Sequence, residues 1–153
     1  MYTELLHSIT AGSTISIMGR QFVPLACALY CAKKSPTSEY GKIFFESHYV
    51  VVISPDDELI YFGKNEGNLG NDRLNRETFE IGGETYTKTT EDVQHLSKIV
   101  FGDSKIVEGD MSFWDYEGKN DPTNIISLGL NDENGERADI VARTLGLSDI
   151  NVN

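Results

Sequence analysis

Along most of this chain hydrophobic residues alternate with polar ones, the pattern of strands that bury one face. The clearest segment is Tyr40–Ser54, which is rich in Phe, Tyr, Val and Ile. Turn residues follow at Pro55–Glu58, and Leu59–Phe62 resumes the apolar pattern. Thr78–Ile81 and Glu84–Lys88 flank a Gly-Gly pair, a common hairpin signal. We therefore expect successive antiparallel hairpins.

The N-terminal region predicts one short helix and a first hairpin. Thr3–Ala11 has apolar residues at helical spacing, and Thr3 is a suitable N-cap. Ser13–Met18 and Gln21–Ala32 then read as two strands joined by a tight turn. Pro24 lacks a backbone donor, so it indicates an edge position or a bulge in the second strand.

Two polar segments are predicted to be loops, and one segment is ambiguous. Lys33–Glu39 contains a Ser-Pro-Thr-Ser run, and Gly63–Glu77 is the longest segment rich in Gly and Asn. The sequence does not determine whether Gly63–Glu77 is ordered. Glu91–Lys98 fits either a strand or a single helical turn.

The C-terminal region predicts two further strands and one undecided element. Asp110–Tyr116 and Ile125–Leu130 alternate as strands, the second with Ile126, Leu128 and Leu130 facing inward. Arg137–Leu145 fits a strand, and residues 136–146 also fit a helix; the preceding Asn-Gly turn favours the strand. We predict a single mainly β domain over residues 1–153, an antiparallel meander forming a small barrel or sandwich. The alternative is an α+β fold with a C-terminal helix.

Charge narrows the range of partners. The 153 residues carry 24 acidic and 13 basic side chains, a net charge of −11, and the acids are densest over residues 108–145. Such a surface repels phosphate groups, so we expect neither nucleic-acid nor anionic-membrane binding. The N-terminus lacks the basic segment and apolar run of a signal peptide, and no apolar stretch reaches about 20 residues, so a cytoplasmic location is expected.

The two cysteines, Cys27 and Cys31, lie in an apolar run. In a strand this spacing separates them by about 13 Å, beyond disulfide reach, and no second pair completes a zinc site. We interpret them as buried thiols without catalytic reactivity.

Candidate chemistry is confined to the acidic segment Glu108–Asp121. Asp110, Asp115 and Glu117 are candidate ligand or metal residues, since carboxylates bind Ca²⁺ or Mg²⁺ and act as acid–base pairs. The competing interpretation is a solvated strand face. Trp114 and Tyr116 form a candidate interaction surface, with a place in the core as the alternative.

Other residues predict no site. No phosphate-binding loop, nucleophile elbow or metal-binding histidine spacing occurs, and no cofactor is expected. The histidines, His7, His48 and His95, lie far apart in the sequence. Arg137 and Asp139 share a strand face and predict a local ion pair, worth about 0.2–1 kcal/mol if exposed.

Several short motifs resemble a family of uncharacterised bacterial β-rich domains of unknown function. They are the segments 11–19 around Ile15-Ser16-Ile17, Phe101-Gly102, 108–117 (Glu-Gly-Asp-Met-Ser-Phe-Trp-Asp-Tyr-Glu), 126–128 and Gly135–Asp139. The resemblance implies a compact antiparallel β fold in a bacterial protein and brings no activity or cofactor.

The sequence thus favours a noncatalytic binding or interaction module, self-associating or docking another protein through its β surface. The first alternative is a carboxylate-dependent enzyme or metal-binding protein that uses Glu108–Asp121. The second is an acidic mimic of nucleic acid, which would bind a basic protein.

Overall fold

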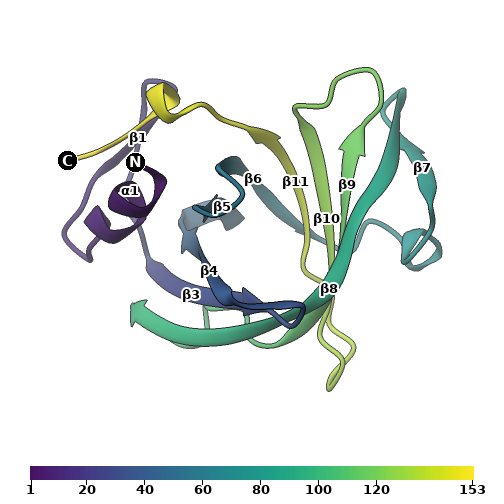
Figure 1. The fold of residues 1–153 in the computed structure, drawn as a ribbon, viewed down its shortest axis with the longest axis horizontal. Helices are drawn as coiled ribbons and strands as arrows, with labels where there is room; N and C mark the ends of the chain where they lie inside the picture. The colour runs from purple at the N-terminus through teal and green to yellow at the C-terminus, as the bar shows by residue number, and fades with distance from the viewer.

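A computed structural model describes all residues 1–153, and it is built mainly from antiparallel strands (Figure 1). The elements are α1 (Tyr2–Ser8), β1 (Ile15–Ile17), β2 (Arg20–Phe22), β3 (Ala26–Ala32), β4 (Ser35–Phe44), η1 (Glu46–His48), β5 (Tyr49–Ser54), β6 (Leu59–Gly67), η2 (Asn71–Arg73), β7 (Thr78–Ile81), β8 (Glu84–Phe101), β9 (Met111–Gly118), β10 (Asn124–Leu130), β11 (Asp139–Thr144), η3 (Leu147–Asp149) and β12 (Ile150–Val152).

Eight of these strands close into a barrel. Their order is β3-β4-β5-β6-β11-β10-β9-β8, and a further pairing of β3 with β8 completes the ring. Strands β3 to β6 form one meander, and strands β8 to β11 form a second. The last strand of the second meander, β11, pairs with the last strand of the first, β6. The mainly β prediction with a small barrel is therefore confirmed.

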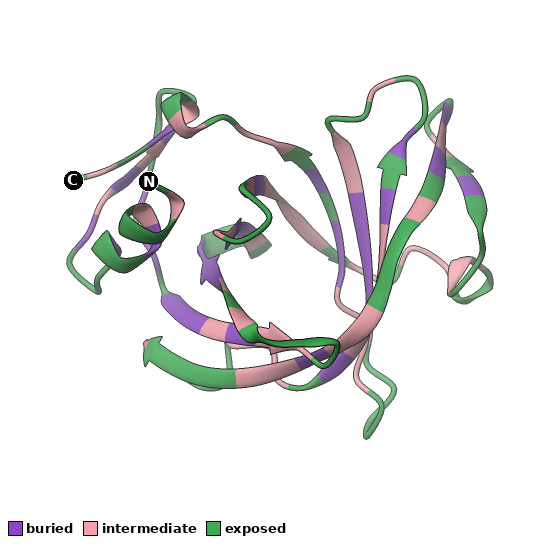
Figure 2. Cartoon of the chain, viewed as in Figure 1, coloured by how far each residue is buried: buried purple, intermediate pink, exposed green.

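Strand β8 joins the two halves of the barrel. Its first part pairs with β7 and β9, and its last part pairs with β3. Buried, intermediate and exposed bands follow one another along it (Figure 2). The helical alternative for Glu91–Lys98 is wrong, because pairing on both sides holds this segment extended with Gln94 buried and its neighbour His95 partly exposed.

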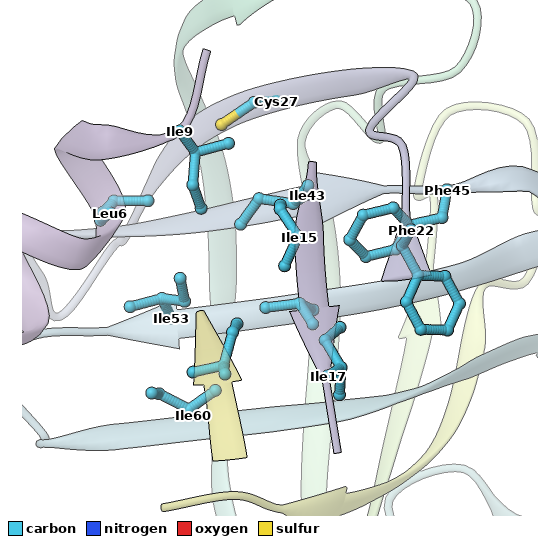
Figure 3. Packing of buried hydrophobic residues seen from close by; sticks show 12 residues of the cluster. Leu6, Ile9, Ile15, Ile17, Phe22, Cys27, Ile43, Phe45, Ile53 and Ile60 are labelled. Atoms are coloured by element: carbon cyan, nitrogen blue, oxygen red, sulfur yellow. The ribbon is translucent and has the colours of Figure 1, made fainter. Parts of the chain in front are cut away.

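One outer face of the barrel is covered by the chain ends. Helix α1 and the small sheet β12-β1-β2 pack against the outward side chains of β3 to β6 (Figure 1). Figure 3 shows this apolar layer in detail. It contains twelve buried residues, Leu6, Ile9, Ile15, Ile17, Phe22, Cys27, Ile43, Phe45, Val51, Ile53, Ile60 and Ile150.

The opposite outer face lies beneath β7 and the segment before it (Figure 1). Phe79 and Tyr86 pack there against Tyr116, Ile126 and Leu128, all buried. Of the three residues predicted to face inward, Ile126 and Leu128 are buried and Leu130 is partly exposed. Ile126 and Leu128 face this outer layer, while Ser127 between them lines the barrel interior.

Five predicted boundaries are wrong. The Tyr40–Ser54 segment is not one strand: the end of β4 and strand β5 pair as a hairpin whose turn contains η1. Helix α1 ends at Ser8, and Met1 rather than Thr3 occupies its N-cap. The Gln21–Ala32 segment is broken into β2 and β3 around Pro24. Most of Lys33–Glu39 belongs to β4, because a tight turn at residues 33–34 lets the chain pair back at once. The Gly63–Glu77 segment is also shorter as a loop, since β6 continues to Gly67 by pairing with β11.

The undecided C-terminal element is a strand, as the Asn-Gly turn favoured. β11 pairs with both β6 and β10. The ion pair predicted for Arg137 and Asp139 is present, and it is buried: the side chains are 4% and 0% exposed, with Nη2 and Oδ2 2.6 Å apart. The reason is that η2 and the residues before it cover this end of β11.

Candidate ligand cavity

The barrel encloses a cavity of about 480 Å³. Alternate residues of every barrel strand face inward, and several of them are small, including Ala32, Ser127, Gly129 and Ala138. Small side chains leave an eight-stranded barrel partly unfilled, and barrels of this size hold one small ligand. The interior is therefore a candidate binding site.

The cavity opens at one end of the barrel. Exposed residues line it near the hairpin turns that follow β3, β5 and β9, including Ser35, Asp57 and Pro122. Thr90 and Glu117, also exposed, stand on neighbouring strands at the same end. These residues form a polar mouth.

Segment 102–110 closes the other end. Lys42 projects from β4 to Glu108, with Nζ and Oε2 2.5 Å apart, and both side chains are nearly buried. The Asn65 amide also donates to Glu108. Gln94 donates to the Gly109 carbonyl at 2.8 Å and accepts from the Tyr40 hydroxyl at 2.9 Å. The polar groups at the floor of the cavity are thus hydrogen-bonded or ion-paired to other protein groups.

Asp115 lies on the cavity wall. It stands on β9 opposite Ser127 of β10, whose hydroxyl donates to Oδ1 at 2.6 Å. Its other carboxyl oxygen, Oδ2, accepts no hydrogen bond from the protein and is not fully buried. Protein surrounds the residue on every side, yet the hollow interior leaves part of it open to a water-sized molecule.

The surroundings of Asp115 alter its acidity. Burial raises the pKa of its carboxyl, while the Ser127 hydrogen bond and the Lys42 charge act in the opposite direction without cancelling it. Burial also raises the pKa of Tyr61 well above its usual value, and the charge of Asp115 contributes to that increase. Tyr61 and Tyr40 both line the cavity, so the carboxyl lies among aromatic side chains.

The structure separates the three predicted carboxylates. Asp115 faces the cavity, and Glu117 is exposed at its mouth. Asp110 is on the outer surface, where it accepts the Leu96 backbone N–H and contacts His95. No group of three or more His, Cys, Asp or Glu side chains is arranged to hold a metal ion.

The predicted aromatic surface is only partly exposed. Tyr116 is 0% exposed, and its hydroxyl donates to the Arg76 carbonyl at 2.7 Å, so it belongs to the core. The prediction of a surface role for Tyr116 is corrected for that reason. Trp114 is half-buried, and its indole N–H donates to Glu91.

Sequence reasoning missed several polar and aromatic cavity residues, including Lys42, Tyr61, Gln94 and Ser127. One signal was present: Lys42 and Ser127 are single polar residues inside otherwise largely apolar strand segments. In a closed barrel with covered outer faces, such positions point to the interior. The alternation by itself did not reveal which face was inside.

The remaining predictions concern thiols and membranes. Cys27 and Cys31 are free thiols, and only Cys27 is buried as predicted, because Cys31 is partly exposed. Burial raises the pKa of the Cys27 thiol to about 11, as an inert buried thiol requires. None of the helical segments combines the length and apolar composition needed to cross a membrane.

Comparison of the chain with family models, with curated proteins and with solved structures finds no match. The resemblance to an uncharacterised bacterial family stays a prediction.

Proposed function

We propose that this protein is a noncatalytic binding module that holds a small, partly apolar organic molecule inside its barrel. The observation that carries the proposal is the 480 Å³ cavity, open at one end and closed at the other. Ligand pockets span about 300–1,000 Å³ and combine apolar walls with a few convergent polar groups. Here Val52, Ile125 and Phe113 supply apolar wall, and Asp115 with Ser127 supplies the polar contact.

The acidic segment supports binding better than catalysis. Glu108 is paired with Lys42, Asp110 lies on the outer surface, and Asp121 binds Thr123 and Arg143 at the barrel rim. An acid–base mechanism on a glycoside needs two carboxyls flanking one bond. Asp115 is the one carboxyl of the segment that lies deep in the cavity.

A tryptophan placed inside the barrel should weaken ligand binding. Ile125 lines the cavity, whereas Val141, on the adjacent strand β11, is 37% exposed on the outer surface. We expect Ile125→Trp to weaken binding of the neutral fluorescent probe N-phenyl-1-naphthylamine by about tenfold or more, because the ring occupies ligand space. Val141→Trp, the matched control, should leave the affinity within about twofold.

The measurement is a fluorescence titration of each variant, with circular dichroism to verify folding. Absence of probe binding by the unsubstituted protein contradicts the proposal. Equal affinity of the two tryptophan variants contradicts it as well, since the probe would then bind elsewhere.

A further inference from the structure

The charged side chains that line the cavity are predominantly acidic. Its acidic lining residues are Asp57, Asp92, Asp115 and Glu117, and its single basic lining residue is Lys42. Lys42 is already neutralised by Glu108 at 2.5 Å. No unpaired positive group therefore faces the interior to receive an anion.

The acids differ in what they bind within the protein. Asp92 accepts the backbone N–H groups of Lys34 and Val93, and Asp57 accepts the Ser54 hydroxyl. Glu117 is exposed to solvent at the mouth. Asp115 alone combines a deep position with a carboxyl oxygen that has no partner.

We propose that the ligand carries a protonated amine on an apolar body, and that its cationic nitrogen docks on the open Oδ2 of Asp115. This inference rests on the proposed function. Ser127 fixes the carboxyl by holding Oδ1, and the rings of Tyr40 and Tyr61 lie nearby in the same cavity. Aromatic faces attract cations by about 0.5–2 kcal/mol when water is excluded. The acids at the mouth attract the same charge on entry.

Binding of the amine is coupled to release of a proton from Asp115. Burial raises the pKa of Asp115, so this carboxyl keeps its proton to a higher pH than an exposed Asp does. At a pH where the carboxyl is protonated, it gives its proton to solvent when the ammonium ion binds, and the ion pair forms. The charged groups that line the same cavity are Lys42, which is paired with Glu108, Asp57 after β5, Asp92 from β8 and Glu117 from the same strand as Asp115. Of these, the Lys42 charge is the one that opposes the upward shift.

Three ligands with one apolar body test the inference: 1-naphthylmethylamine, 1-naphthylmethanol and 1-naphthoic acid. We expect the amine to bind about tenfold or more tightly than the alcohol at neutral pH, and the acid to bind most weakly. In Asp115→Asn the amine should lose about tenfold in affinity, while the alcohol changes less than about threefold. Glu133→Gln, which removes an exposed acid in the turn between β10 and β11, outside the cavity lining, should change the amine's affinity less than about threefold.

Isothermal titration calorimetry in buffers of different ionisation enthalpy provides the second readout. Amine binding should release protons at mildly acidic pH, and Asp115→Asn should abolish that release. If the alcohol binds as tightly as the amine, or if Asp115→Asn leaves the preference intact, the inference fails while the proposed function stands. If none of the three ligands binds, the proposed function fails as well.

The stability of Asp115→Asn should depend on pH in a defined direction. An unfolded Asp titrates near about 3.9, and burial raises the folded-state pKa above that value. The folded state then binds the proton more tightly, so stability is lost as pH rises from the unfolded to the folded pKa. We expect the variant to melt at a higher temperature than the unsubstituted protein at neutral pH, with the gap narrowing toward about pH 4. A gap independent of pH, measured by thermal denaturation, would contradict the assignment.

Discussion

Replacing Asp139 with Ala is expected to cost about 3–5 kcal/mol of unfolding free energy, the effect of leaving one member of a buried ion pair without its partner. The Asp139 side chain is 0% exposed and pairs with Arg137 through both oxygens. It also accepts the backbone N–H groups of Leu69 and Gly129. One carboxylate therefore links β10, β11 and the segment after β6.

Urea denaturation measures this change, and for a chain of this size the melting temperature should fall by about 10 °C. Arg143→Ala is the matched control. Arg143 pairs with Asp121 at 3.3 Å on the surface, with exposures of 64% and 43%, and its loss should cost less than about 1 kcal/mol. If the two variants unfold at the same urea concentration, the buried pair does not have the assigned role.

The second large effect is expected at Gly63. A Cβ atom added there would lie 2.0 Å from the Val141 carbonyl oxygen and 2.5 Å from the Ala142 Cα. Both contacts are to the backbone of β11, which cannot rotate away. Gly63→Ala must therefore push β6 from β11 at the junction of the two meanders, and we expect it to cost about 1–3 kcal/mol or more.

Gly109→Ala is the control for this substitution. No atom lies within 4 Å of a Cβ added at Gly109, so the variant should unfold within about 0.5 kcal/mol of the unsubstituted protein. The urea concentrations at which Gly63→Ala and Gly109→Ala are half unfolded test this prediction. Equal midpoints would show that the β6–β11 contact tolerates a side chain.

The strands were predictable from sequence because their period is local. Thr78–Ile81, Glu84–Lys88 and Asp110–Tyr116 each alternate over a few residues, and their turns carry the expected glycines. Boundaries failed where pairing overrode local composition. Ser35 and Pro36 have poor strand propensity, but the turn at residues 33–34 places them in β4 beside β3.

The cavity was not predictable in the same way, because it exists only when the strands close into a barrel. Alternation shows that Ile126 and Leu128 share one face and Ser127 the other. Which face is the interior is decided by the β3–β8 pairing and by β7 covering the outside, both of which join distant residues. Asp115 was identified as a candidate from its place in the acidic segment. Strand alternation already separates it from Asp110, because residues five apart point to opposite faces, but only barrel closure shows that the face of Asp115 is the interior.

The pairing of β1 with β12 has a consequence for the order of folding. Residues near the two ends of the chain, Ile15 and Val152, are cross-strand partners. During synthesis the outward faces of β4 and β5 emerge long before β12 exists to complete their cover. Contacts between distant residues form late and slowly. Until β12 leaves the ribosome, a nascent chain therefore lacks the part of this apolar layer that Ile150 supplies, and partly folded chains with exposed apolar surface are prone to aggregate.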